Sequence, residues 1–111
     1  MDFASLNLCQ PLLDALDEIG YVTPTPIQAQ TIPDIIEGRD MLGCAQTGTG
    51  KTAAFALPIL DAIAENPWSG SRRIRALMLC PTRELASQIN DNIEQYARHL
   101  DIRSMVMFGG V

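Results

Sequence analysis

RDMLGCAQTGTGKTAAFALP, residues 39–58, joins an apolar run, a loop rich in glycine and threonine, and an alanine-rich segment. The apolar run at 40–44 is typical of a buried parallel strand, and the segment 51–57 predicts a helix directly behind the loop. Gly48 and Gly50 allow backbone angles at which successive N–H groups turn toward phosphate oxygens, beside the positive end of that helix. The stretch therefore predicts a strand, a phosphate-binding loop and a helix.

The loop follows the spacing G-x-x-x-x-G-K-[ST], with Ala45 in the place of the first glycine. We expect Lys51 to reach the β- and γ-phosphates of a nucleotide, and Thr52 to offer its hydroxyl to the Mg²⁺ ion that bridges them. The alternative, a glycine turn with an incidental lysine, does not explain the order Gly50-Lys51-Thr52 between a strand and a helix. The predicted nucleotide-binding residues of the loop are Ala45, Gln46, Thr47, Gly48, Thr49, Gly50, Lys51 and Thr52. Of these, Lys51 and Thr52 are also the predicted catalytic residues, and Thr52 is the predicted metal ligand.

The composition is that of one globular domain rather than of a disordered chain. The 111 residues are 47% hydrophobic and 19% charged. No apolar run is long enough to span a bilayer, and the start of the chain, MDF, is acidic, unlike a signal peptide. Cys9, Cys44 and Cys80 have neither metal-ligand nor disulfide spacing. We therefore expect a cytoplasmic protein with reduced thiols and no membrane partner.

The net charge of −5 argues, taken alone, against a nucleic-acid partner. The acidity is concentrated at the start of the chain. Residues 1–37 contain six acidic side chains and no lysine or arginine, whereas residues 38–111 contain eight basic and seven acidic side chains. Charge therefore allows a nucleic-acid surface on the later part of the chain, although it does not demonstrate one.

Two helices are predicted ahead of the phosphate loop. Apolar residues recur at helical spacing from Leu12 to Ile19, and we expect a capping box of Asn7 and Gln10 at the start of this first helix. Gly20 is expected to end it.

The second helix is expected to begin with Thr25 as N-cap and Pro26 at the first helical position. We expect an interruption at Pro33, because proline removes a backbone hydrogen bond, and an end at Gly38.

The elements after the loop alternate between helix and strand. The loop helix is expected to run to about Ala64 with a kink at Pro58, followed by a strand at 74–80, a helix at 83–100 and a strand at 102–108. Strand–helix–strand connections of this length predict a parallel sheet. The sequence thus predicts an α/β fold with flanking helices, with about three strands and four or five helices.

Several separate stretches together resemble the DEAD-box RNA helicases. They are Phe3, GYVTPTPIQ at 20–28, AQTGTGKT at 45–52, PTRELA at 81–86 and the pair Gly109-Gly110. The resemblance implies an enzyme that uses ATP and Mg²⁺ to unwind or remodel RNA, built from two RecA-like domains. This chain matches the beginning of the first such domain. On this basis residues 1–38 form its adenine-recognition helical segment, and residues 39–111 its P-loop α/β core, incomplete at the C-terminal end.

The resemblance gives Gln28 and Phe3 roles in binding adenine. Gln28 matches the glutamine that reads the adenine edge, and its amide can both accept from the amino group and donate to a ring nitrogen. Phe3 matches the upstream aromatic that packs on the base. The alternative for Gln28 is purely structural, because its position three residues after Thr25 also completes a capping box.

The same resemblance predicts RNA contacts at two places. Thr82 is a candidate N-cap and Arg83 lies in the first turn of the helix that follows, an arrangement that suits a phosphate. The alternative is that Thr82 only caps the helix and Arg83 pairs with a surface carboxylate. Gly109 and Gly110, which alone would indicate a turn, match the glycines that let RNA approach the backbone.

The sequence contains no D-E-A-D tetrad. Phosphoryl transfer needs a carboxylate that helps to hold Mg²⁺ and a group that orients water. We therefore expect the chain alone to bind without turnover, and two alternatives to a helicase stay open. One is a nucleotide- and RNA-binding fragment, and the other is an unrelated P-loop nucleotide kinase, which leaves GYVTPTPIQ and PTRELA unexplained. The last predicted strand leaves an unpaired sheet edge, through which we expect self-association.

Overall fold

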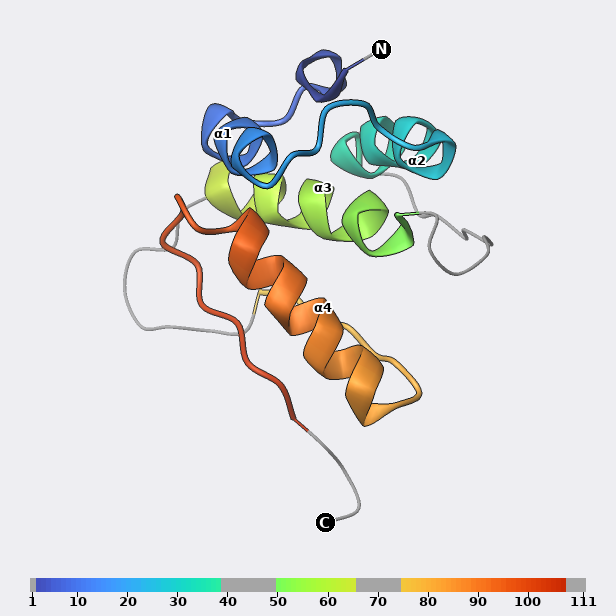
Figure 1. Ribbon diagram of the computed structural model, residues 1–111, viewed down its shortest axis with the longest axis vertical. Helices are drawn as coiled ribbons and strands as arrows, with labels where there is room; N and C mark the ends of the chain where they lie inside the picture. The colour runs from blue at the N-terminus through green and yellow to red at the C-terminus, as the bar shows by residue number, and fades with distance from the viewer. Residues whose placement is uncertain (1, 39–49, 66–74, 108–111) are drawn as a thin grey trace.

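A computed structural model describes residues 2–38, 50–65 and 75–107 of the chain. The described part contains a short 3-10 helix, η1, and four α-helices (Figure 1). Their bounds are Phe3–Leu6 for η1, Gln10–Glu18 for α1, Pro26–Ile36 for α2, Lys51–Glu65 for α3 and Arg83–Tyr96 for α4. In Figure 1, α1 and α2 lie along one side of α3, and α4 extends from the other side.

The end of α1 is fixed by a glycine, as the sequence predicted. Gly20 has a φ of 87°, a region that favours glycine because it has no Cβ. Its N–H donates to the carbonyl of Asp17 at 3.1 Å, and the Tyr21 N–H donates to the carbonyl of Leu16 at 2.8 Å. This pair of bonds is a Schellman motif, which satisfies carbonyls that the end of a helix leaves open.

The predicted start of α1 is wrong. Cys9, not Asn7, is the N-cap, and it makes no side-chain capping bond. Asn7 instead ends η1 with a left-handed φ of 65°, a conformation that asparagine tolerates better than most residues. Asn7 is therefore the C-cap of η1 and not the N-cap of α1.

The capping of α2 is confirmed, but its interruption is not. Thr25 is the N-cap of a complete capping box, and Pro26 occupies the first turn. The helix continues through Pro33 to Ile36 without a break, so the predicted interruption is wrong. The burial of Ile32 against the other helices offsets the lost backbone bond. Gly38, with a φ of 86°, follows the end of the helix as expected.

One hydrophobic core joins η1, the four α-helices and the residues just after α4. Its side chains come from every described helix, and its members are Phe3, Leu6, Leu8, Leu12, Leu16, Ile32, Ala53, Ala56, Leu57, Leu60, Tyr96 and Ala97. The two alanines of α3 are small enough for neighbouring helices to pack closely against it. The core fixes α3, and with it the residues at its start, against α2.

α3 continues through Pro58 to Glu65, close to its predicted end. α4 begins at Arg83 as predicted but ends at Tyr96, so its predicted end at Leu100 is wrong. Ala97 is its C-cap, and the backbone N–H of Leu100 donates to the carbonyl of Ala97 at 2.9 Å, in a turn rather than a continued helix.

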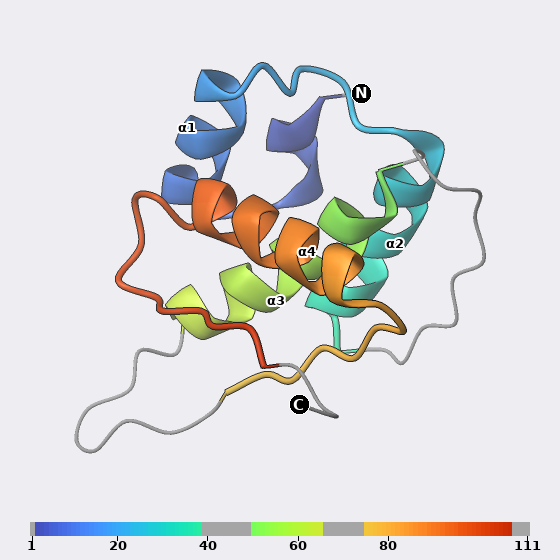
Figure 2. The same cartoon turned by 60° about the horizontal axis from the view of Figure 1, so that its bottom comes forward.

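The predicted strands at 74–80 and 102–108 are not confirmed, because residues 75–80 and 101–107 contain no strand. Their side chains still alternate. Leu77, Leu79, Met105 and Met107 are exposed, while residues between them, such as Met78, are half-buried. Figure 2 shows both segments as irregular traces on the side of α4 away from α1. A strand needs a hydrogen-bonded neighbour, and the predicted neighbour at 40–44 lies outside the described residues. The described part is therefore helical, and the parallel sheet stays a prediction.

Candidate nucleotide-binding site

The last residues of the predicted phosphate loop open α3. Gly50 precedes the helix with a φ of 81°, Lys51 is its first residue and is exposed, and Thr52 is half-buried. The first N–H groups of a helix have no partner within the helix and carry partial positive charge, which suits an anion. The remaining predicted loop residues, at 45–49, lie outside the described residues.

Gln28 links the start of α2 to the start of α3. Its side-chain Nε2 donates to the Gly50 carbonyl at 3.1 Å, and its Oε1 accepts from the Thr25 N–H at 3.0 Å. The Gln28 N–H in turn donates to Thr25 Oγ1 at 3.4 Å, which completes the capping box. The side chain is nearly buried, with 3% of its surface exposed. The capping function that the sequence allowed is therefore present.

Capping and base recognition by Gln28 are compatible in hydrogen-bond capacity. A side-chain amide has two N–H donors and two lone pairs, and the contacts to Gly50 and Thr25 use one of each. Within the part of the chain that the structure describes, these contacts leave one donor and one lone pair, the two groups that recognition of an adenine edge requires.

Gly50 is required by its surroundings as well as by its backbone angle. A Cβ on this residue would clash with Gln28 Nε2 and lie 3.1 Å from Thr25 Oγ1. Gly20 and Gly38 also have positive φ values, but a Cβ on either would have no heavy atom within 4 Å. The close approach of the backbone at Gly50 is what allows the amide of Gln28 to reach its carbonyl.

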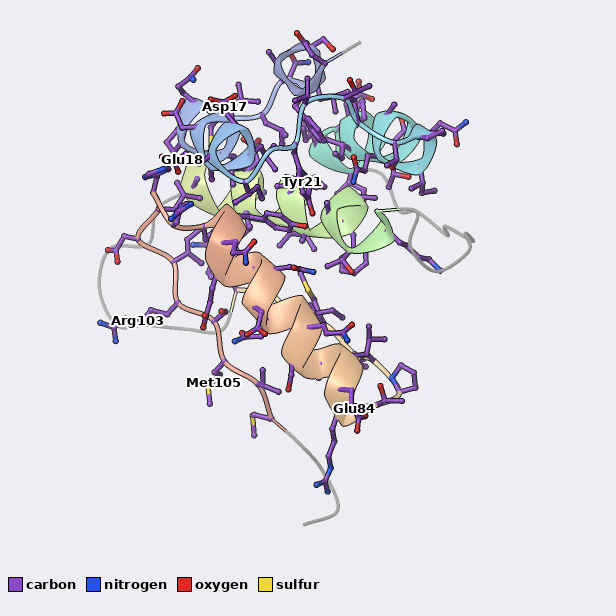
Figure 3. The ribbon with its side chains drawn as sticks, viewed as in Figure 1. Asp17, Glu18, Tyr21, Glu84, Arg103 and Met105 are labelled. Carbon is purple, nitrogen blue, oxygen red and sulfur yellow. The ribbon has the colours of Figure 1, made fainter. Side chains whose placement is uncertain are left out.

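Phe3 lies in the core, with 4% of its surface exposed. The helix that carries it, η1, contacts α2, which carries Gln28. The Phe3 ring packs on Tyr21, with 6.2 Å between ring centroids. Tyr21 then meets Tyr96 of α4 edge to face, with 5.9 Å between centroids and 3.2 Å between the hydroxyl oxygens. Tyr21 belongs to the α1–α2 connection, and Figure 3 shows it on the side of that connection that faces α3 and α4.

Sequence patterns gave no sign of this aromatic contact, because it joins residues far apart in the chain. Tyr96 is 2% exposed. Burial, together with the hydrogen bond to Tyr21, raises the pKa of the Tyr96 hydroxyl, so it stays protonated.

A second contact that the sequence did not reveal is made by Asp61 of α3. Its carboxylate is 2% exposed, and Oδ1 accepts from the Cys9 N–H at 2.7 Å. Burial, followed by smaller effects that include the Asp61 side chain, raises the pKa of the Cys9 thiol. Asp61 therefore supplies from α3 an acceptor for the backbone N–H of Cys9, the N-cap residue of α1.

The predicted RNA-binding residues at the start of α4 are exposed. Thr82 Oγ1 accepts from the Leu85 N–H at 3.2 Å, so the predicted cap is confirmed. Arg83 is exposed beside it, and Glu84 adds a negative charge to the same turn. Gly109 and Gly110 lie outside the described residues.

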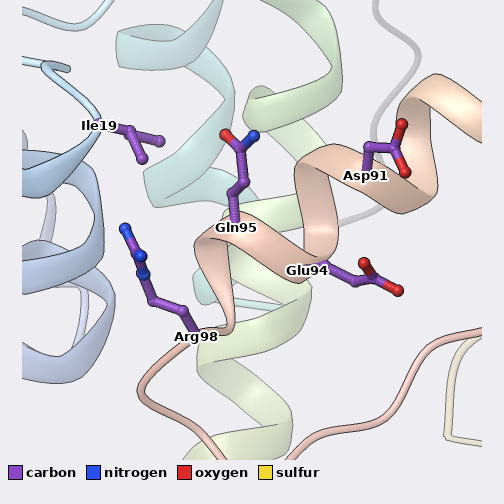
Figure 4. Close-up of a pocket in the computed structure, with 5 residues that line it drawn as sticks. All are labelled: Ile19, Asp91, Glu94, Gln95 and Arg98. Atoms are coloured by element: carbon purple, nitrogen blue, oxygen red, sulfur yellow. The ribbon is translucent and has the colours of Figure 1, made fainter.

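A surface hollow of about 530 Å³ lies beside α4, away from the predicted site residues. Its lining is formed by Ile19, Asp91, Glu94, Gln95 and Arg98 (Figure 4). In Figure 4, Gln95 and Arg98 point toward Ile19, whereas Glu94 points the other way. Within the described ranges, no group of three metal-binding side chains occurs. None of the helices described there is both long and apolar enough to cross a membrane.

Comparison with known proteins identifies the family that these features fit. The family model for the DEAD/DEAH box helicases matches residues 25–111. The chain is 48% identical over 109 residues to the ATP-dependent rRNA helicase rrp3 of Aspergillus fumigatus, covering 98% of this chain and 22% of that protein. It therefore spans about a fifth of the length of this curated relative.

Solved structures agree with the sequence match. The RNA-helicase Prp28 of Chaetomium thermophilum bound to ADP superimposes with a TM-score of 0.88 at 39% identity, over 99% of this chain and 27% of that one. A DEAD box protein of Methanococcus jannaschii superimposes with a TM-score of 0.77 at 40% identity, over 86% and 25%. The described helices thus have the arrangement found in DEAD-box helicase domains.

Proposed function

This chain belongs to the DEAD/DEAH box helicase family, and from that premise we propose that it forms the ATP-binding part of an RNA helicase. The enzyme would use ATP hydrolysis to unwind or remodel RNA. Residues 1–38 would recognise adenine, and residues 39–111 would supply the phosphate-binding core and the first RNA contacts. The family match and the ADP-bound structural relative support this assignment.

The observation that carries the proposal is the hydrogen bond from Gln28 to the Gly50 carbonyl, 3.1 Å long. It joins the amide that would read the base to the residue that opens the phosphate-loop helix. An adenine nucleotide must place its base and its phosphates at two such points at once. The bond supports one site that binds both ends of the nucleotide, rather than two unrelated features.

The proposed roles follow from the chemistry of each side chain. Lys51, exposed at the start of α3, would compensate phosphate charge. Thr52 would offer its hydroxyl to Mg²⁺, which when bound neutralises charge on the phosphates. Phe3 would pack on the base, Gln28 would read its edge, and the loop residues at 45–49 would add backbone N–H groups.

RNA would contact the start of α4. Thr82 caps the first turn of the helix, and Arg83, exposed in that turn, would add a positive charge near the helix N-terminus, where a backbone phosphate is favoured. Gly109 and Gly110 are proposed to let RNA approach the backbone. A cytoplasmic location and self-association through a sheet edge also stay predictions.

A second candidate function is binding of nucleotide and RNA without turnover. It describes the 111 residues taken by themselves, which contain no D-E-A-D tetrad to supply the carboxylate that phosphoryl transfer uses with Mg²⁺. The nucleotide-kinase alternative is disfavoured, because the family match extends over PTRELA.

The first prediction tests base recognition by Gln28. The chain should bind ATP more tightly than GTP, and Gln28→Ala should abolish this preference, because the amide fits the donor and acceptor pattern of adenine. Titration of each nucleotide against both proteins measures the preference. Gln30→Ala, at an exposed position of the same helix, is the matched control and should keep it. If Gln28→Ala lowers only thermal stability and keeps the preference for ATP, Gln28 is a capping residue and not a base-reading one.

A further inference from the structure

We infer that Tyr96, through its hydroxyl contact with Tyr21, is a positioning residue for the adenine end of the proposed nucleotide site. The inference rests on the proposed adenine roles of Phe3 and Gln28, and it adds a residue of α4 to that site. Tyr96 lies outside the stretches that resemble the family motifs.

Tyr21 stands between the two parts of the site that would meet the base. On one side its ring packs on Phe3, with 6.2 Å between centroids and 31° between ring planes. Along the chain it precedes Thr25, which begins the capping box with Gln28. A shift of Tyr21 would therefore move the surface against which Phe3 packs and the connection that leads into the cap of α2.

Local contacts hold the backbone of Tyr21 but not its ring. The Tyr21 N–H is fixed by its 2.8 Å bond to the Leu16 carbonyl. The side chain is 38% exposed, and an exposed ring can normally adopt more than one rotamer. In this structure the ring has neighbours on both sides, Phe3 and Tyr96.

Tyr96 is held in the core, so its contacts can fix the orientation of the Tyr21 ring. It is 2% exposed within the core, and it occupies the last position of α4. Its hydroxyl oxygen lies 3.2 Å from that of Tyr21, and the rings meet at 62° with centroids 5.9 Å apart. This edge-to-face contact and the hydroxyl pair together select one rotamer of Tyr21.

The consequence is specific to the base. The phosphates would be bound by the loop and by Lys51 at the start of α3. Tyr21 and Tyr96 belong to other elements, the α1–α2 connection and the end of α4. Loss of the Tyr96 hydroxyl should therefore weaken the binding of an adenine nucleotide while leaving the binding of inorganic pyrophosphate unchanged. A merely structural role would lower both affinities together.

The test compares Tyr96→Phe, Tyr21→Phe and the double variant in the 111-residue chain. Affinities for ADP and for pyrophosphate are measured by NMR titration, which suits weak binding, and thermal unfolding is recorded in parallel. We expect each single variant to bind ADP roughly three- to tenfold more weakly, the factor that one hydrogen bond typically carries. We expect the double variant to lose no more than the worse single variant, because both changes remove the same contact.

The two single variants should differ in their melting temperatures even if they lose similar ADP affinity. Tyr21→Phe leaves the buried Tyr96 hydroxyl without its partner, whereas Tyr96→Phe leaves a Tyr21 hydroxyl that water can reach. The first should therefore lower the melting temperature more than the second. Leu100→Ala, which removes packing near the end of α4, is the control that should lower the melting temperature without changing the ratio of ADP to pyrophosphate affinity.

Unchanged ADP affinity in Tyr96→Phe, or an equal loss of ADP and pyrophosphate binding, would overturn the inference. Its failure is distinguishable from failure of the proposed function. If the unmodified chain prefers ADP to GDP and Tyr96→Phe leaves ADP binding unaltered, only the role of Tyr96 is refuted. If the unmodified chain shows no preference for ADP, the adenine roles of Gln28 and Phe3 are wrong, and the role of Tyr96 falls with them.

Discussion

Single residues at the helix starts were the most predictable part of the site. Thr25, Gln28 and Thr82 were identified from spacing, and each makes the capping bond that its position predicted. A capping bond spans three residues, so the sequence contains all of its participants. Asn7 was mispredicted because its left-handed conformation belongs to the preceding 3-10 helix. The Gln28–Gly50 bond spans 22 residues, and no local pattern could have indicated it.

Replacement of Gly50 by alanine tests its close contact with Gln28, and the same change at Gly20 is the control. Gly50→Ala should destabilise the chain more than Gly20→Ala. Both replacements put an alanine at a positive φ, which costs about 1 kcal/mol. Only Gly50→Ala also forces a Cβ against Gln28, and overpacking of this kind adds about 1–3 kcal/mol. Urea unfolding of both variants measures the difference. Equal losses would mean that Gln28 moves aside freely and that the contact does not hold the site.

The helices were easier to predict from the sequence than the strands, because a strand needs a neighbouring segment to complete its hydrogen bonds. The amphipathic helices were predicted because a helix forms its backbone bonds within itself. The segments 74–80 and 102–108 were predicted as strands from apolar runs, but a strand depends on a partner that the pattern does not contain. Pro33 was predicted to interrupt α2, but this helix continues through it to Ile36. Packing of α2 against the core overrides the local preference of proline.

Replacement of Asp61 tests the hydrogen bond that joins α3 to the start of α1. Asp61→Ala should cost about 1–3 kcal/mol of unfolding free energy, since the part-buried Cys9 N–H loses its charged acceptor. Asp61→Asn keeps an oxygen at that place and should cost less. Chemical denaturation of both variants gives the comparison. Glu65→Ala, at the exposed end of the same helix, should change the free energy by no more than about 0.5 kcal/mol. An Asp61→Ala loss as small as that of Glu65→Ala would remove the proposed link between the two helices.

The whole molecule brings the two predicted segments of the site into one core. Residues of η1, α1 and α2 pack with those of α3 and the end of α4, so the proposed base-binding and phosphate-binding parts are not separate bodies. The sequence predicted the family and its site residues through motifs. It did not predict the contacts of Tyr96 and Asp61, because these join elements across the core and leave no periodic signal along the chain.

At this scale we predict that the 111-residue chain has no RNA-stimulated ATPase activity. Positioning and charge stabilisation do most of the work in phosphoryl transfer. The chain has the Lys51-Thr52 pair but no D-E-A-D tetrad. Phosphate release under multiple-turnover conditions, with and without RNA, is the measurement. Lys51→Ala serves to exclude a contaminating enzyme. Turnover that this variant abolishes would contradict the prediction and would require a magnesium-binding acid elsewhere in the chain.

The alternating exposure in the segments before and after α4 has a chemical consequence for their sulfur atoms. Met105 and Met107 are 79% and 82% exposed, whereas Met78 is half-buried. Dilute hydrogen peroxide should therefore convert Met105 and Met107 to their sulfoxides well before Met78, as peptide mass spectrometry would show. The added oxygens would make this surface polar without touching the helical core. A sample oxidised in this way should keep its circular dichroism spectrum and become more soluble, and preferential oxidation of Met78 would contradict the alternation.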